Sequence, residues 1–277
     1  MKRLAFLASG AAAAASAGMP VYACASPYAH VEAIVRDVPG VVGVYCRTLA
    51  AGPPLFEYNP RMQFPTASTI KTLIMATAYV EEEQHPGALH QRLATKWGER
   101  TVQQLIWPMI VVSDNDAAND LMTHLGMAKI NAVAQRLGMH ETRLARHFLD
   151  FEAIVHHNDN VTTPADMSKL LFAIASGARE GTSTICSPEH CRSMIRIMLH
   201  QTDRDKIPAG LPSGTAVANK TGEIDGSRSD IAIVQPMGDS PYILTLYSKW
   251  LEAYPPVYDA FRRIARLSYR LAMRSYA

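Results

Sequence analysis

The stretch Ser68-Thr69-Ile70-Lys71 is the most informative part of the sequence. It predicts the start of a helix that carries a serine and a lysine able to act as a reactive pair. It follows Phe64-Pro65-Thr66 and runs into the apolar segment Leu73-Ile74-Met75. Residues three apart lie on the same face of a helix, so the Ser68 hydroxyl and the Lys71 amine should be neighbours. A partly desolvated lysine with a lowered pKa can take the proton of a serine nucleophile. The spacing alone is more often an ordinary helix face.

The block Ser113-Asp114-Asn115 follows an apolar run and supplies a second hydroxyl and an amide. By itself such a cluster is typical of a helix N-cap. In a catalytic interpretation, Ser113 relays a proton to a leaving nitrogen. Asn115 would hold a substrate amide and orient Lys71.

The third block, Lys220-Thr221-Gly222, ends a predicted strand. Gly222 allows a ligand to approach the backbone closely, while Lys220 and Thr221 can hold a carboxylate. The three blocks together predict a serine acyl-transfer enzyme that acts on an anionic substrate. Its covalent chemistry needs only Ser68 and Lys71, so we expect no metal and no organic cofactor.

The composition is that of a globular protein with a sizeable core. The chain has 277 residues, 48% of them hydrophobic, and a formal net charge of +2. This length suits one large domain or two interleaved layers. The nearly balanced charge gives no electrostatic footprint for nucleic acid.

The first 25 residues resemble a cleaved secretory signal peptide. Lys2 and Arg3 precede an Ala-rich apolar run over residues 4–18, which small residues follow. We therefore expect a periplasmic or secreted protein; a lipid anchor on Cys24 is the less favoured alternative. No later stretch is expected to span a membrane.

The order of the predicted elements indicates an α+β fold. Strands are expected near both ends of the chain, helices between them, and a terminal helix over residues 257–274. We predict an antiparallel sheet, flanked by helices, from residues 26–62 and 212–277. An all-helical domain, 63–211, is inserted between these parts and carries a long polar loop, 143–163. A site is expected where the two parts meet.

Cys186 and Cys191 flank a predicted helix start. In an oxidising compartment they could form a short-loop disulfide, or they could stay reduced, and the sequence leaves both open. A metal site with His190 is disfavoured, because the chain offers only this one cysteine pair.

The three blocks, in this order, resemble the penicilloyl-serine transferase superfamily and are most similar to class A β-lactamases. The resemblance covers nearly all of the chain after the leader, including Thr162-Thr163-Pro164-Ala165 and Gly226-Ser227-Arg228. It implies that Ser68 is acylated, that Lys71 is its proton partner and that Ser113 protonates the β-lactam nitrogen. It also implies that the N–H groups of Ser68 and Glu223 form an oxyanion hole. The side chains of Lys220, Thr221 and Arg228 would then bind the substrate carboxylate.

The chain departs from that family in the polar loop. Class A enzymes carry a glutamate there that activates the deacylating water, and the alignment places Phe148 at that position. Asp150 and Glu152 lie two and four residues further on. Either carboxylate, or Lys71, is a candidate for the missing base; the alternative is that both carboxylates are structural and pair with Arg143 or Arg146.

Three functions are therefore consistent with the sequence. The leading one is a monomeric β-lactamase whose turnover is slow, since losing a general base typically costs roughly 10²–10⁴-fold. The second is a D-Ala-D-Ala carboxypeptidase or esterase, whose substrate is a peptidoglycan-like peptide. The third is a penicillin-binding protein that traps β-lactams without hydrolysis.

Overall fold

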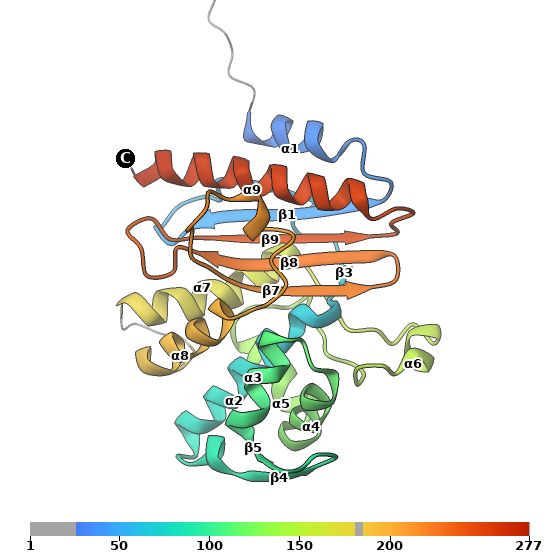
Figure 1. Cartoon of the computed structure of the whole chain (residues 1–277), viewed down its shortest axis with the longest axis vertical. Coiled ribbons are helices and arrows are strands. Elements are labelled where there is room, and N and C mark those ends of the chain that lie inside the picture. Colours follow the sequence, from blue (N-terminus) through green and yellow to red (C-terminus); the bar gives the residue numbers. More distant parts are fainter. Residues whose placement is uncertain (1–25, 181–184, 277) are drawn as a thin grey trace, which may run out of the picture.

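The computed structural model describes residues 26–180 and 185–276. Its centre is a five-stranded antiparallel sheet with the strand order β2-β1-β9-β8-β7 (Figure 1). The strands are β1 (Val41–Thr48), β2 (Phe56–Tyr58), β7 (Val217–Ile224), β8 (Ser227–Val234) and β9 (Tyr242–Lys249). The two ends of the chain meet where β1 pairs with β9, with Val44 opposite Leu246. The prediction of an antiparallel sheet from both termini is confirmed.

Two terminal helices, α1 (Pro27–Val35) and α9 (Pro255–Tyr276), cover one face of this sheet (Figure 1). The α9 helix buries Ile264 and Leu267 against the sheet, while Arg263 and Arg266 face solvent. This division is the amphipathic pattern expected of a helix that lies on a sheet.

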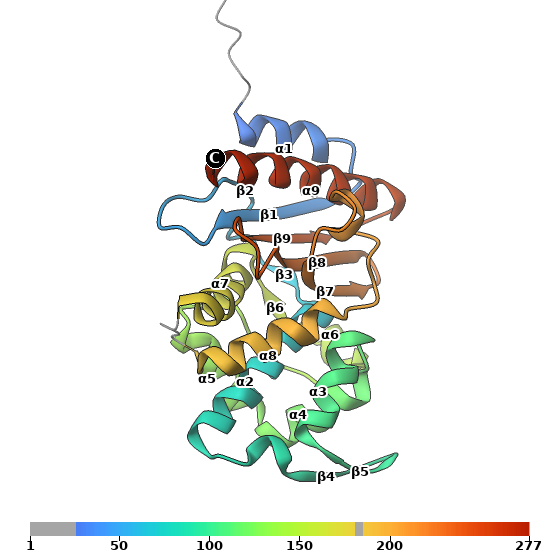
Figure 2. The same ribbon diagram turned by 60° about the vertical axis from the view of Figure 1, so that its left-hand side comes forward.

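The helices α7 (Pro164–Glu180) and α8 (Pro188–Leu199) lie against the other face (Figure 2). The other helices from the middle of the chain lie further from the sheet: α2 (Lys71–Gln84), α3 (Val102–Val111), α4 (Asn115–Leu125) and α5 (Met127–Arg136). The α2 helix is buried continuously from Lys71 to Val80, because the other helices surround it. The helices α7 and α8 begin at Pro164 and Pro188, because proline suits the first turn of a helix.

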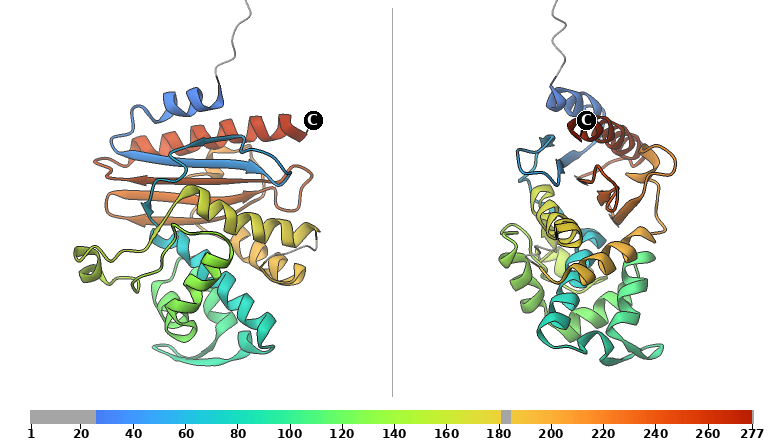
Figure 3. Two further views of the ribbon diagram at one scale, coloured as in Figure 1. Left: turned by 180° about the vertical axis from the view of Figure 1, so that it is seen from behind. Right: turned by 90° about the vertical axis from the view of Figure 1, so that its left-hand side faces the viewer.

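The inserted region was predicted to be all-helical, but it also contains a β-hairpin. The α2 helix ends at Gln84, and a short turn, η2 (Ala88–His90), leads into a hairpin of β4 (Arg92–Thr95) and β5 (Gly98–Thr101) (Figure 3). Most hairpin side chains are exposed. The strands therefore lack the buried alternating face by which a strand is recognised in a sequence.

The long loop also contains regular structure. A short helix, α6 (Phe151–Val155), lies in its middle, and β6 (Val161–Thr162) pairs with β3 (Phe64–Pro65) just before the Ser68 turn. The Thr66 N–H donates to the Asn160 carbonyl at 2.9 Å. The loop is therefore attached directly to the segment that positions Ser68.

Cys186 and Cys191 lie side by side, with their Sγ atoms 3.5 Å apart. The two sulfurs are in contact, and of the two alternatives that the sequence left open, the structure has the one without the disulfide bond. The signal-peptide prediction lies outside the described residues. Within the described part of the chain, no helix is both long enough and apolar enough to cross a membrane.

Candidate active site

Ser68 lies in a 3₁₀ turn, η1 (Ala67–Ile70), that leads directly into α2. Lys71 is the first residue of α2, three residues after Ser68, and side chains at this spacing lie on one face of a 3₁₀ turn. Ala67, immediately before the serine, has φ of 44°, a strained conformation for a residue with a Cβ. Thr69 fixes the turn through a 2.8 Å hydrogen bond between its Oγ1 and the hydroxyl of Tyr247 on β9.

The Lys71 amine connects the first block to the second. Its Nζ is hydrogen-bonded to the Ser113 carbonyl at 2.7 Å and to Asn115 Oδ1 at 2.7 Å, and it lies 3.2 Å from Ser113 Oγ. Burial lowers the pKa of Lys71 to about 6, and the nearby charge of Lys220 acts in the same direction. At neutral pH the amine is therefore largely uncharged and can accept a proton.

The Ser113 hydroxyl connects the second block to the third. Ser113 has φ of 59°, a rare conformation for a serine, at the start of the turn before α4. Its Oγ accepts a 3.0 Å hydrogen bond from Nζ of Lys220, on the buried edge strand β7. Burial also lowers the pKa of Lys220 to about 7. The three blocks therefore meet at one place, the junction between the sheet and the helical region.

Gly222 brings the β7 backbone against the Ser68 turn. A Cβ at Gly222 would lie 3.0 Å from the Ser68 nitrogen and 2.5 Å from Ser229 Oγ. Only glycine fits without displacing these atoms. The approach places the next residue on the strand, Glu223, beside Ser68, where the resemblance expects the two N–H donors of an oxyanion hole.

Phe148 covers the side of Lys71 where the resemblance expects a glutamate. The Lys71 Nζ lies 4.4 Å from the centre of the phenyl ring. Asn119 on α4 holds the backbone of Phe148 in place: its Oδ1 accepts from the Phe148 N–H at 2.8 Å and its Nδ2 donates to the Phe148 carbonyl at 3.1 Å. An apolar ring, rather than a base, is therefore built into this position.

A buried ion pair between Arg146 and Asp159, at 2.8 Å, joins the start of the loop to its end. We call this closed part of the loop its neck. Asn160 supports the same neck, because its Oδ1 accepts from the N–H groups of Ala145 and Arg146. The ion-pair partner of Arg146 is thus Asp159. The alternative in which Asp150 or Glu152 pairs with Arg146 is wrong.

Asp150 and Glu152 are not brought to the reactive centre. The Asp150 carboxylate accepts from the Ala153 N–H and caps α6, and both side chains are solvent-exposed. Neither belongs to the described residues that line the cavity beside Ser68. Their spacing after Phe148 suggested a base, but the turn into α6 directs them to solvent, so the geometry does not support that role.

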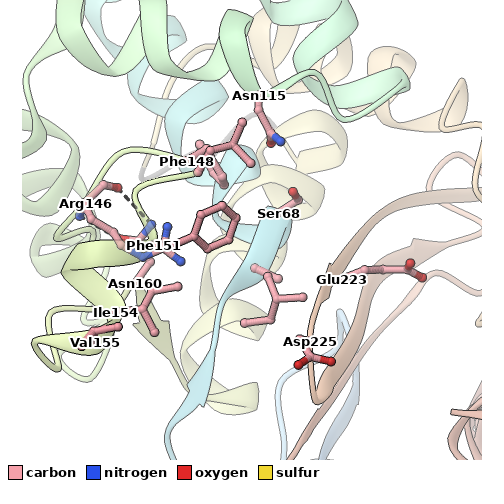
Figure 4. Close-up of a pocket in the computed structure, with 13 residues that line it drawn as sticks. Ser68, Asn115, Arg146, Phe148, Phe151, Ile154, Val155, Asn160, Glu223 and Asp225 are labelled. Atoms are coloured by element: carbon pink, nitrogen blue, oxygen red, sulfur yellow. Dashed lines mark hydrogen bonds between the residues drawn. The ribbon is translucent and has the colours of Figure 1, made fainter. Parts of the chain in front are cut away.

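A cavity of about 580 Å³ opens between the loop and the end of β7. Figure 4 shows Ser68 between the loop side chains on one side and Glu223 and Asp225 on the other. The loop wall is largely apolar, formed by Phe148, Leu149, Phe151, Ile154 and Val155. The cavity can therefore hold an apolar group attached to a carbonyl that reacts with Ser68.

A second, more polar cavity of about 280 Å³ adjoins Ser68 on the Ser113 side. The predicted carboxylate-binding residue Thr221 lines it, together with two acidic residues, Asp203 and Glu223. The sequence reasoning missed Asp203, which belongs to no motif, and considered only the backbone of Glu223.

Arg228 is not aimed at this cavity, contrary to the role that the resemblance implied. Its guanidinium stacks on Tyr254 with 3.7 Å to the ring centre, and its Nη1 donates to the carbonyls of Ile224 and Ser227. Its Nε lies 3.7 Å from Glu223. Thr221 lines this cavity, and Lys220, which is fully buried, lies behind it in contact with Ser113.

Within the described ranges, no group of three or more His, Cys, Asp and Glu side chains is placed to hold a metal ion. The described residues bring together at the site a serine in the turn that leads into the Lys71 helix, a second hydroxyl, Ser113 Oγ, between the amines of Lys71 and Lys220, and the close backbone approach at Gly222.

Comparison with known proteins places this geometry in a family. The carbapenem-hydrolysing β-lactamase KPC of Klebsiella oxytoca is 26% identical over 244 residues, which cover 81% of this chain and 80% of the relative. A β-lactamase of Citrobacter koseri is 28% identical over 208 residues, covering 69% of each chain.

Solved structures agree. An ancestral class A β-lactamase has a TM-score of 0.77 at 25% identity and covers 88% of this chain and 99% of its own. The structure of PBP-A has a TM-score of 0.78 at 24% identity, covering 89% and 95%, and shares the fold. The model of the β-lactamase enzyme family matches residues 26–272. This chain belongs to the β-lactamase enzyme family, as a class A-like serine hydrolase.

Proposed function

We propose that β-lactams acylate this enzyme at Ser68, and that it hydrolyses them with slow release of the acyl group. One observation carries the proposal: the uncharged Lys71 amine lies beside the nucleophile turn and is hydrogen-bonded to both Ser113 and Asn115. This amine can accept the Ser68 proton as the Oγ–carbon bond forms. The N–H groups of Ser68 and Glu223 stabilise the resulting oxyanion.

The ring nitrogen leaves on the Ser113 side. Ser113 Oγ donates its proton to that nitrogen as the C–N bond breaks, and it is reprotonated through Lys71 or Lys220, both of which contact it. Lys220 and Thr221 hold the substrate carboxylate. Asn115 orients Lys71 and is close enough to contact the acyl side of the substrate.

Slow release follows from Phe148. Hydrolysis of the acyl-enzyme needs a base to activate water, and a phenyl ring occupies the place where class A enzymes have a glutamate. Losing such a base costs about 10²–10⁴-fold in that step. The same ring favours the second candidate function, a penicillin-binding protein or D-Ala-D-Ala carboxypeptidase that retains β-lactams.

Pre-steady-state hydrolysis of a chromogenic cephalosporin tests the proposal. The wild type should release about one product per chain in a burst, followed by a slow phase, because acylation outpaces deacylation. Ser68→Ala should abolish the burst. If the wild type shows neither a burst nor turnover, the proposal is wrong. If it turns over rapidly without a burst, the slow-release part is wrong.

Phe148→Glu tests the origin of the slow phase. The backbone clamp of Asn119 does not depend on the side chain at 148, so the new carboxylate should lie near Lys71 and raise the slow rate at least about 10-fold. Phe151→Glu adds the same charge elsewhere in the same cavity and is the matched control. Equal gains in both variants would contradict the assignment. Release of D-alanine from a D-Ala-D-Ala peptide would favour the second function.

We also propose that the chain is exported, loses residues 1–25 and acts as a periplasmic or secreted monomer. The charged and apolar pattern of the first residues supports this. The mass of the chain recovered from the periplasm or medium tests the cleavage, and light scattering tests the monomer. Recovery only as the full-length chain in the cytoplasm would contradict it.

A further inference from the structure

The smaller cavity beside Ser113 has a negative wall. It is bounded by Ser68, Ser113 and Thr221 on the reactive side and by Asp203 and Glu223 further out. Side-chain exposure is 30% for Asp203 and 43% for Glu223, so both carboxylates are accessible to a ligand in the cavity. The resemblance gave no reason to expect acidic side chains beside a carboxylate-binding strand.

These two carboxylates are fixed in place. Lys206, whose side chain is only 1% exposed, donates to Asp203 Oδ2 at 2.6 Å and to Glu223 Oε1 at 2.7 Å. The Tyr258 hydroxyl donates to the same Glu223 oxygen at 2.8 Å. One buried cation therefore holds two carboxylates. Arg228 also approaches Glu223, with its Nε 3.7 Å from Oε1. Neither Lys206 nor Arg228 is among the described residues that line the cavity, so the charges that its wall presents are those of the two carboxylates.

Both acids stay ionised at neutral pH. Burial acts to raise the pKa of Asp203, but the hydrogen bond and charge of Lys206, together with hydrogen bonds from the Asp205 N–H and Thr221, outweigh it and hold the pKa below its usual value. For Glu223, burial is outweighed by the hydrogen bonds with Lys206 and Tyr258 together with the charges of Lys206 and Arg228, and its pKa is also lowered.

Lys206, Lys220 and Arg228 lie near this cavity but are not among the described residues that line it. Arg228 stacks on Tyr254 and caps backbone carbonyls, as described above. Lys220 is fully buried and donates to Ser113 and to the Thr221 carbonyl at 2.7 Å. Lys220 therefore lies behind the wall of the cavity, where its charge can attract a substrate carboxylate, while Asp203 and Glu223 line the wall itself.

The position of Ser113 determines which part of the substrate lies beside these acids. Ser113 protonates the departing nitrogen, so groups attached on the leaving side of the scissile amide enter the cavity that Ser113 lines. The acyl side chain enters the larger apolar cavity beside Phe148.

We propose that this enzyme selects β-lactams that carry a positive charge on the leaving-group side, and that Asp203 and Glu223 provide the selection. The proposal rests on the proposed β-lactam acylation. It predicts that a fixed cation on the ring fused to the lactam speeds acylation, and that a second negative charge at that place slows it.

A matched pair of cephalosporins tests it. Both carry the same thienylacetamido side chain; one has a neutral acetoxymethyl group at C3 and the other a cationic pyridiniomethyl group. The ratio of their second-order acylation rate constants is measured by stopped flow and intact mass. Intrinsic differences in reactivity cancel when the ratio in a variant is divided by the wild-type ratio.

In Asp203→Asn the cationic-to-neutral ratio should fall about 3- to 5-fold, the range of a partly exposed ion pair. Asp205→Asn removes the same charge two residues away, at an exposed position, and should leave the ratio unchanged. Raising the ionic strength should lower the wild-type ratio without any substitution, because salt screens exposed charges.

Three outcomes would overturn the proposed selection of cationic substrates and leave the acylation proposal intact. They are an unchanged ratio in Asp203→Asn, an equal fall of the ratio in Asp205→Asn, and a wild-type ratio that does not depend on salt. If neither cephalosporin forms an adduct with the wild type, both proposals are wrong.

Discussion

Replacing Gly222 by alanine should disable acylation more than it destabilises the fold. The new Cβ would lie 3.0 Å from the Ser68 nitrogen and from Ala67 Cβ, and 2.5 Å from Ser229 Oγ. Relaxed contacts between such atoms are about 3.5 Å, so β7 and the Ser68 turn must separate by roughly half an ångström. Overpacking of this kind costs about 1–3 kcal/mol in unfolding free energy.

The rate effect should be larger, because the displaced groups are the proposed oxyanion donors. Losing one such donor costs about 10²–10³-fold. Stopped-flow acylation gives the rate and urea unfolding gives the stability. Adding Ser229→Ala removes the Oγ contact, so the double variant should regain stability but stay slow, since the contact with the Ser68 backbone persists.

Gly238→Ala, at a turn away from the site, is the control and should acylate normally. If Gly222→Ala acylates at the wild-type rate while remaining folded, the close approach of β7 does not form the oxyanion hole.

Three other results are expected. The acylation rate should rise with pH and be half-maximal near pH 6, because the lowered pKa of Lys71 leaves its amine uncharged above that value; a pH–rate profile with its limb near 10 would contradict this. Asn119→Ala should cost about 1–3 kcal/mol of unfolding free energy, because the buried N–H and carbonyl of Phe148 lose their partners; unchanged urea unfolding would refute the clamp. Asp159→Asn should cost about 3 kcal/mol of unfolding free energy by urea unfolding, since it leaves the buried Arg146 charge uncompensated. A loss of only a few tenths of a kcal/mol would show that this ion pair does not hold the neck of the loop.

The sequence predicted what local patterns encode. The three blocks identified the reactive side chains because each combines chemistry with a helix start or a strand end. The starts at Pro164 and Pro188 were predictable from proline in a first helical turn. The apolar stripe of α9 is a local pattern of the kind that indicates which face of a helix lies on a sheet.

The rest depends on contacts between distant residues. The hairpin of β4 and β5 was missed because its exposed strands show no buried alternation. Asp159 could not be singled out as the partner of Arg146, since three acids follow that arginine in the loop. The Asn119 clamp on Phe148 joins residues 29 apart along the chain, and the Asp203–Lys206–Glu223 group belongs to no motif.

The most direct test of the account is the intact mass of the protein over time after one equivalent of benzylpenicillin, with peptide mapping of the adduct. We expect a single penicilloyl group on the peptide that contains Ser68, formed quickly and lost slowly. An unmodified mass throughout, or an adduct on a peptide without Ser68, would contradict the central claim that this serine and Lys71 form the reactive pair.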